Sequence, residues 1–224
     1  MYRTLPHVPD SCEYGIKGPV TNHYHFLTRW RVRATPEEVY AIVSAPLEYP
    51  RWWPSVYLAV DETGPRRFRL HTRGWLPYTL RWDAETVVAE RPGRIEVAAS
   101  GDFEGRGIWS IRADGEFTDI SFDWNLRAEK PVLRNLTFLL RPVFEANHRW
   151  AMEMGLQSLE LELERSRAMT ARAMNSIPAP PRPPHLSERT ILAGALLAGG
   201  IVAALVISAG GEGDKVSQPA RGSA

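Results

Sequence analysis

Residues 119–167 read DISFDWNLRAEKPVLRNLTFLLRPVFEANHRWAMEMGLQSLELELERSR, and the spacing of the apolar residues changes within this stretch. Every second residue from Ile120 to Leu126 is apolar, which is the pattern of a half-buried β-strand. From Pro131 to about Arg167, apolar residues recur every three or four positions and predict a long amphipathic helix. The stretch therefore predicts the last strand of a sheet followed by one long helix.

The strand pattern repeats through the sequence before this helix. Apolar and polar residues alternate over His23–Arg33 and again, strand after strand, over Val56–Arg127. Asp114-Gly115 is typical of a tight hairpin turn, and we interpret Gly101, Gly105 and Gly107 as bulges or a tight hairpin. Sequential antiparallel strands with one apolar face make a single curved sheet. The long helix is the one element that can cover that face, and a shorter helix ending near Leu140 could precede it.

A short helix and an aromatic loop are expected between the first two strands. Thr35-Pro36-Glu37-Glu38 supplies an N-cap, a proline at the first helical position and a capping-box acid, so a helix should run through Val43. Tyr49-Pro50-Arg51-Trp52-Trp53-Pro54 follows, and we predict a proline-bracketed loop there. Arginines on the polar faces of the strands, such as Arg31 and Arg69, should pair with acidic residues across the sheet. Attraction of these arginines to anionic headgroups is the alternative.

The C-terminal part predicts a membrane anchor. Ile191–Ala209 is a run of 19 residues without a charge, long enough as a helix to cross a bilayer. The basic residues flanking it slightly favour a cytoplasmic domain, and the N-terminus has no apolar signal-peptide core. Small residues in the span could support weak self-association. The predicted order is an N-terminal extension (1–21), a folded domain (22–172), a Pro-rich spacer (173–189), a transmembrane helix (190–209) and a disordered tail (210–224).

Composition excludes several function classes. The 27 basic and 26 acidic residues leave no electrostatic case for nucleic acid as a partner. Cys12 is the single cysteine, which rules out an intrachain disulfide and a cysteine-based zinc cluster. The six histidines show no metal-ligand spacing. We therefore expect neither a metal nor a cofactor.

Three segments carry a resemblance to a known family. They are ATPEEVYAIV at 34–43, EYPRWWP at 48–54, and NHRWAM at 147–152 followed by Gly155. With the order of strands and helices over residues 22–168, the chain resembles the START-like (SRPBCC) superfamily, in particular its polyketide cyclase/dehydrase and lipid-transport branch. The resemblance implies an α+β helix-grip fold, in which a curved seven-stranded antiparallel sheet wraps around the C-terminal helix. The predicted transmembrane helix lies outside the family pattern.

The resemblance also implies a cavity between sheet and helix. Few polar groups amid large apolar surface would suit a lipophilic ligand. The alternative is that the same aromatic residues pack a solid core. The side chains predicted to line the cavity are Trp30, Trp53, Phe68, Leu70, Tyr78, Trp82, Trp109, Phe122, Trp124, Phe144, His148 and Met152.

Three functions are compatible with these features. The first is membrane-tethered transport or sensing of a hydrophobic small molecule, possibly a lipid, because the tether favours a membrane-derived ligand. The second is a cyclase or dehydratase in which His148 or Tyr78 acts as acid or base, although a structural role is the commoner one for a buried histidine. The third is an interaction module with a vestigial cavity.

Overall fold

The computed structural model describes residues 23–75, 79–127 and 131–182. The predictions for Tyr78, for the N-terminal extension and for the 190–209 span lie outside these residues. The elements are β1 (His23–Val32), α1 (Pro36–Val43), the short 3-10 helix η1 (Pro46–Glu48), α2 (Tyr49–Trp52), β2 (Tyr57–Gly64), β3 (Arg67–Arg73), β4 (Thr79–Glu90), β5 (Arg94–Gly101), β6 (Glu104–Asp114), β7 (Phe117–Arg127), α3 (Pro131–Arg167) and α4 (Ala171–Ser176).

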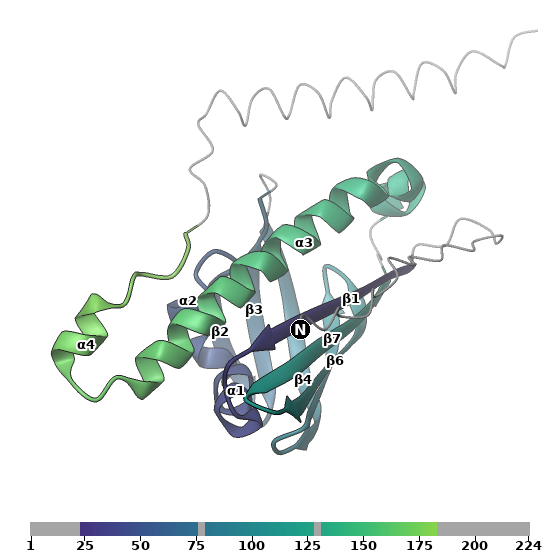
Figure 1. Ribbon diagram of the computed structural model, residues 1–224. Helices are drawn as coiled ribbons and strands as arrows, with labels where there is room; N and C mark the ends of the chain where they lie inside the picture. The colour runs from purple at the N-terminus through teal and green to yellow at the C-terminus, as the bar shows by residue number, and fades with distance from the viewer. Residues whose placement is uncertain (1–22, 76–78, 128–130, 183–224) are drawn as a thin grey trace, which may run out of the picture.

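One antiparallel sheet carries the fold, and α3 lies across its concave side (Figure 1). The strand order is β1-β7-β6-β5-β4-β3-β2, so consecutive strands pair as hairpins except that β1 joins β7. The predicted seven-stranded sheet and long C-terminal helix are confirmed. The alternation in β1 is also confirmed, because Tyr24, Trp30 and Val32 are buried while the residues between them are exposed or half-buried.

The cap predicted for the first helix is present in α1. The Thr35 side chain accepts a hydrogen bond from the Glu38 backbone, and the Glu38 carboxylate accepts one from the Thr35 backbone at 2.8 Å. Arg167, the last residue of α3, donates to the same carboxylate at 2.7 Å. The Arg167 hydrogen bond and the Thr35 backbone lower the pKa of Glu38 to about 2. One acid therefore caps α1 and ties the end of α3 to it.

The segment Tyr49–Pro54 differs from the predicted loop. Residues Tyr49–Trp52 form the helical turn α2, because Pro50 lies at a position where a helix needs no backbone donor. The buried Tyr49 hydroxyl donates to the Val43 carbonyl oxygen at 2.5 Å and holds this turn against α1. Arg51 extends from α2 to α3 and donates two hydrogen bonds to the Glu162 carboxylate, at 2.9 and 2.7 Å.

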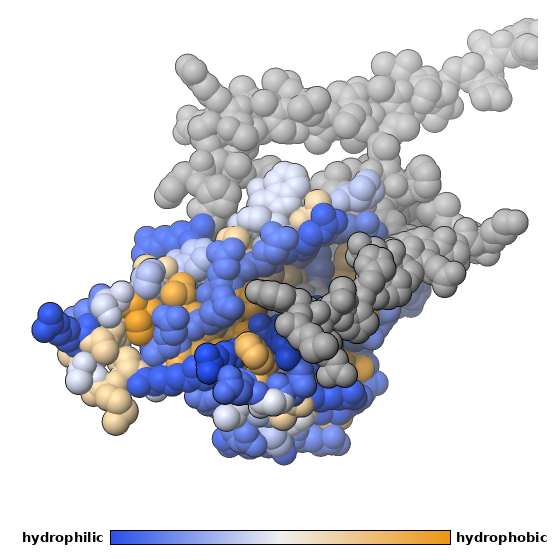
Figure 2. Space-filling view, in the orientation of Figure 1, coloured by the Kyte–Doolittle hydropathy of each residue, from blue (hydrophilic) through white to orange (hydrophobic). Residues whose placement is uncertain are grey.

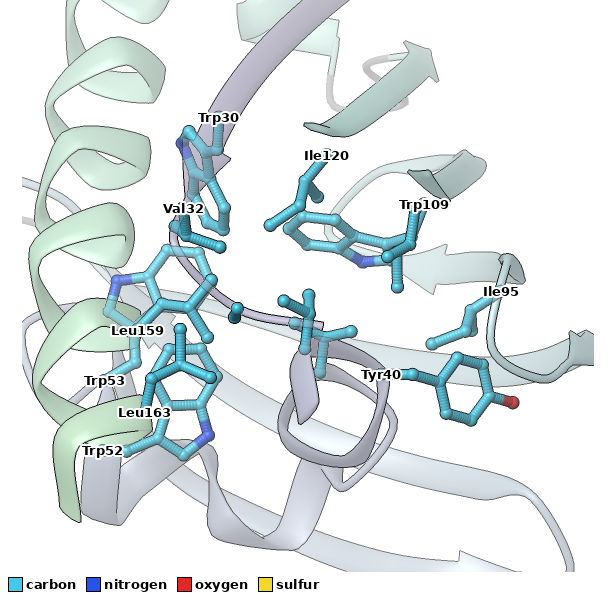
Figure 3. Packing of buried hydrophobic residues seen from close by; sticks show 14 of the residues in the cluster. Trp30, Val32, Tyr40, Trp52, Trp53, Ile95, Trp109, Ile120, Leu159 and Leu163 are labelled. Carbon is cyan, nitrogen blue, oxygen red and sulfur yellow. The ribbon is translucent and has the colours of Figure 1, made fainter. Parts of the chain in front are cut away.

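The backbone of α3 approaches the rest of the fold closely at Gly155. A Cβ atom there would come within 2.3 Å of the Trp53 indole, so the ring lies directly on the helix backbone. One and two turns further along α3, Leu159 and Leu163 are buried against Trp52 and Trp53 (Figure 3). This contact fixes the distance between α3 and the concave face of the sheet.

The convex face carries paired charges. Arg31 contacts Asp119 at 2.9 Å, Arg67 contacts Glu85 at 3.1 Å and Arg69 contacts Asp83 at 3.0 Å, all across neighbouring strands. The predicted cross-sheet pairing is confirmed for these residues. Exposed pairs of this kind contribute roughly 0–1 kcal/mol each, so they keep the face soluble rather than hold the fold together.

The helical part of the chain is continuous where a separate shorter helix was considered. Residues Pro131–Arg167 form one helix that continues through Pro142. Helix α4 follows over Ala171–Ser176, and Thr170 caps its N-terminus. Within residues 23–75, 79–127 and 131–182, no helix has the length and hydrophobicity needed to cross a membrane.

The contact at Gly155 predicts a stability effect. Gly155→Ala should lower the free energy of unfolding by about 1–2 kcal/mol, because overpacking against Trp53 outweighs the higher helix propensity of alanine. Urea denaturation followed by circular dichroism measures this change. Gln157→Ala, an exposed position on the same helix, should stay within about 0.5 kcal/mol of the wild type. An unchanged or higher stability of Gly155→Ala would show that α3 does not rest on Trp53.

Candidate ligand-binding site

A cavity of about 250 Å³ lies between α3 and the concave face of the sheet. One water molecule needs roughly 10–15 Å³ on this measure, so the space exceeds what a single solvent molecule fills by more than tenfold. In Figure 2, hydrophilic residues cover most of the visible surface, and apolar residues show mainly in the strip between α3 and the strands beneath it. Ten of the twelve predicted residues line the cavity: Trp53, Phe68, Leu70, Trp82, Trp109, Phe122, Trp124, Phe144, His148 and Met152.

Trp30 is placed differently from the prediction. Its ring lies 5.9 Å from the Trp53 ring and 5.4 Å from the Trp109 ring, and only 6% of the residue is exposed. It faces inward as the alternation requires, but these two large neighbours stand between it and the cavity. Trp30 thus belongs to the solid core shown in Figure 3. The apolar face of the sheet therefore borders a packed core in one part and a cavity in another.

Aromatic rings form the sheet side of the cavity. The Trp109 and Phe122 rings stack at 4.2 Å with 22° between their planes, and Phe122 and Trp124 stack at 5.3 Å with 25°. Trp82 and Phe103 close one end of this row, at 5.9 Å each from Trp124. We call Trp109, Phe122 and Trp124 the aromatic stack.

Gly107 in β6 makes room for the aromatic stack. A Cβ atom there would lie 2.5 Å from the Trp124 ring and 2.9 Å from the Phe122 ring, whereas one at Gly105 would lie 2.1 Å from the Asn125 carbonyl oxygen. The sequence predicted bulges or a tight hairpin at Gly101, Gly105 and Gly107. In the structure Gly101 ends β5 with a φ of 120°, before the turn to β6, whereas Gly105 and Gly107 are regular members of β6, paired with β7.

His148 faces the cavity from α3. Its Nε2 lies 3.3 Å from the Thr28 hydroxyl, and its ring stacks on Phe26 at 4.3 Å and 19°. Burial lowers the pKa of His148 to about 4, so the imidazole is neutral near pH 7. A neutral imidazole in this position can exchange one hydrogen bond with a ligand, but it is a weak base.

The other polar residues that line the cavity include two charged ones, Arg73 and Asp102, together with Thr72, Thr86 and Asn147. The Thr72 hydroxyl accepts a hydrogen bond from the Trp82 indole at 3.1 Å, and Asn147 accepts one from the Trp75 backbone at 3.0 Å. The buried Tyr24 hydroxyl has no hydrogen-bond partner, so a ligand oxygen near it would satisfy a group that is otherwise costly to bury. At the α2 end, burial raises the pKa of Tyr49 and Tyr57, which keeps both phenols neutral.

Several of these residues were absent from the sequence prediction. Tyr24 and Phe26 share the inward face of β1 with Trp30, so the alternation could have identified them. Tyr57 begins β2 at a register shift and Phe103 lies in the turn before β6, where alternation gives no signal. Tyr78 lies outside the described residues, and the role of every lining residue in binding stays a prediction. Among the described residues, no three His, Cys, Asp or Glu side chains converge as metal ligands would.

Comparisons with known proteins agree with this architecture. A model of the polyketide cyclase / dehydrase and lipid transport family matches residues 25–164, which include all seven strands in part or whole and most of α3. The chain belongs to this family. No curated protein matches the chain.

Three solved structures of other proteins have a similar fold. A START superfamily protein from Mycobacterium smegmatis is 17% identical with a TM-score of 0.53, covering 63% of this chain and 98% of its own. A protein from Thermus thermophilus is 17% identical with a TM-score of 0.53, covering 65% and 100%. The Zhui aromatase/cyclase from a Streptomyces species is 19% identical with a TM-score of 0.54, covering 66% and 98%. At these identities the likeness concerns the fold alone.

The burial of His148 predicts a pH dependence of stability. In the unfolded chain a histidine takes up a proton near its ordinary pKa of 6.5, whereas folded His148 does so near pH 4. Acidification from pH 7 to pH 5 therefore favours the unfolded chain, by on the order of 1–2 kcal/mol from this residue. Glu38 does not affect this comparison. The stability that its lowered pKa contributes is present above its ordinary pKa of 4.5 and is lost only at lower pH.

Urea denaturation at pH 7 and pH 5 measures this effect. We expect the loss of stability on acidification to be smaller in His148→Gln than in the wild type. His23→Gln changes an exposed position in β1, and this variant should lose as much stability between pH 7 and pH 5 as the wild type. Equal losses in all three proteins would mean that the His148 imidazole is not held neutral by burial.

Proposed function

We propose that the domain binds a hydrophobic small molecule in the cavity beneath α3, and that residues 190–209 tether the protein to a membrane from which this ligand comes. The observation that carries the binding proposal is the roughly 250 Å³ cavity, whose wall is mostly apolar and aromatic. An empty apolar space costs stability in proportion to its size, so a domain that keeps one gains by filling it.

The cavity wall favours binding over acid-base catalysis. A general base works best with a pKa near the working pH, and the pKa of His148 is about 4. The imidazole is also oriented by Thr28 and Phe26, which suits a fixed hydrogen-bond partner for a ligand. Transport or sensing therefore stands ahead of the cyclase alternative.

The tether is proposed from the sequence. Residues 191–209 carry no charge and have the length of a bilayer-spanning helix, and the proline-rich stretch before them is a stiff spacer. A tethered domain meets a membrane-dissolved ligand at high local concentration. We place the domain on the cytoplasmic side, as the flanking basic residues favour.

The binding proposal is tested by filling the cavity. Ala151 lines it from α3, and Ala151→Trp should occupy the space, whereas Glu153→Trp adds the same ring at an exposed position on the same helix. The full chain is purified in a mild detergent, and native mass spectrometry with solvent extraction measures co-purified small molecules. We expect a near-stoichiometric hydrophobic molecule in the wild type and in Glu153→Trp, and its loss in Ala151→Trp. A bound molecule retained in Ala151→Trp, or none in any protein, contradicts the proposal.

The tether is tested by fractionation. The full chain should remain in the membrane pellet after alkaline carbonate extraction, and a variant lacking residues 190–209 should move to the supernatant. The loss of about 20 apolar residues removes the whole insertion energy, so partial release is not expected. A full chain that carbonate extracts, or a shortened chain that stays in the pellet, would refute the anchor.

A further inference from the structure

The chain beyond α3 is folded but stands outside the core. Helix α4 (Ala171–Ser176) lies past the C-terminal end of α3, away from the sheet (Figure 1). The Thr170 side chain accepts a hydrogen bond from the Ala173 backbone at 3.1 Å, and Arg165 of α3 donates one to the Pro178 carbonyl oxygen. The loop that carries α4 is therefore closed onto α3, so α4 has a fixed place at this end of the domain.

This loop exposes apolar side chains that the described part of the chain does not cover. Met169 is 94% exposed and Met174 is 48% exposed, and every residue from 169 to 176 is exposed. A single apolar residue on a protein surface is ordinary. Two methionines on one short loop, neither of them used for packing, are available for a contact outside the domain.

The charges on the same loop are almost all positive. Residues 164–182 contain four arginines and one acid, Glu164. Arg165 and Arg167 form ion pairs within the domain. Arg172 and Arg182 are exposed, and neither forms an ion pair with any residue that the structure describes. The loop thus combines exposed methionines with unneutralised positive charge, and this composition favours an anionic lipid surface.

We propose that Met169, Arg172, Met174 and Arg182 form a membrane-contact surface, which lies on an anionic bilayer with its methionines among the lipid headgroups. The arginine stems lie at the same level, and the guanidinium groups bind lipid phosphates. The proposal rests on the proposed tether and goes beyond it, because it states which end of the domain faces the membrane and which lipid charge it recognises. A surface this small binds weakly alone, but the tether supplies a high local concentration of lipid.

The length of the spacer favours this end of the domain. Arg165 holds the chain at Pro178, about 12 residues before the predicted span, and an extended proline-rich chain of that length reaches roughly 37 Å. Helix α3 has 37 residues and is therefore about 55 Å long. A domain standing on the N-terminal end of α3 would hold Pro178 too far from the bilayer for the spacer to reach it. A domain resting on α4 meets no such limit.

The test measures how far a bilayer protects the two methionines. The full chain is placed, one chain per disc, in lipid nanodiscs of phosphatidylcholine alone or of phosphatidylcholine with an equal part of phosphatidylglycerol. Hydrogen peroxide converts accessible methionine to the sulfoxide, and peptide mass spectrometry gives a rate for each residue. Half-buried Met154, in the middle of α3, is the control within the same chain.

We expect Met169 and Met174 to be oxidised at least about threefold more slowly in the anionic discs, and Met154 at the same rate in both. Each arginine near an anionic surface shifts the docking equilibrium by a factor of about five. Arg172→Gln combined with Arg182→Gln should therefore abolish most of the difference. Arg29→Gln combined with Arg112→Gln removes the same charge at exposed strand positions, and this variant should keep the difference.

Each other outcome overturns a defined part. Equal rates for Met169 and Met174 in the two kinds of disc, with the chain incorporated in both, overturn the membrane-contact surface and leave the tether standing. Protection that survives the loss of Arg172 and Arg182, or that appears only with several chains per disc, means that another surface or a second copy covers the methionines, and also overturns it. A folded chain that does not enter the discs contradicts the proposed tether itself.

Discussion

The Trp53 indole lies on the backbone of α3 at Gly155, where a Cβ atom would come within 2.3 Å of the ring. This contact sets how closely the helix approaches the sheet, and the Arg51–Glu162 and Glu38–Arg167 pairs fasten the same C-terminal half of α3. Toward the helix N-terminus, Phe144 and His148 of α3 pack on Tyr24 and Phe26 of β1. These side chains also border the cavity, which lies between α3 and the aromatic stack.

The architecture was predictable because its causes are local. Alternation identified the strands, the Asp114-Gly115 turn is present between β6 and β7 with Gly115 in the left-handed region, and the capping box at Thr35 marked the start of α1. The change of apolar spacing after Leu126 located α3. Each of these signals is a relation between neighbours in sequence, and binary patterning of this kind largely decides the fold class.

The site was less predictable because it depends on distances between elements. Alternation shows that Trp30 and Trp109 both face inward, but not that one is packed in the core while the other borders a cavity. The meaning of Gly107 is visible only once Trp124 lies across from it, and the turn at Tyr49 depends on a hydrogen bond to Val43. The neutral state of His148 likewise comes from burial between α3 and β1.

The central claim is that a hydrophobic molecule occupies the space between α3 and the aromatic stack. A crystal structure of the protein purified from cells, without added ligand, is the most direct measurement. We expect continuous elongated density between Met152 and the Trp124 ring that the protein chain and separate waters do not explain. A structure in which α3 has closed onto the sheet, or in which only isolated waters fill the space, would contradict it.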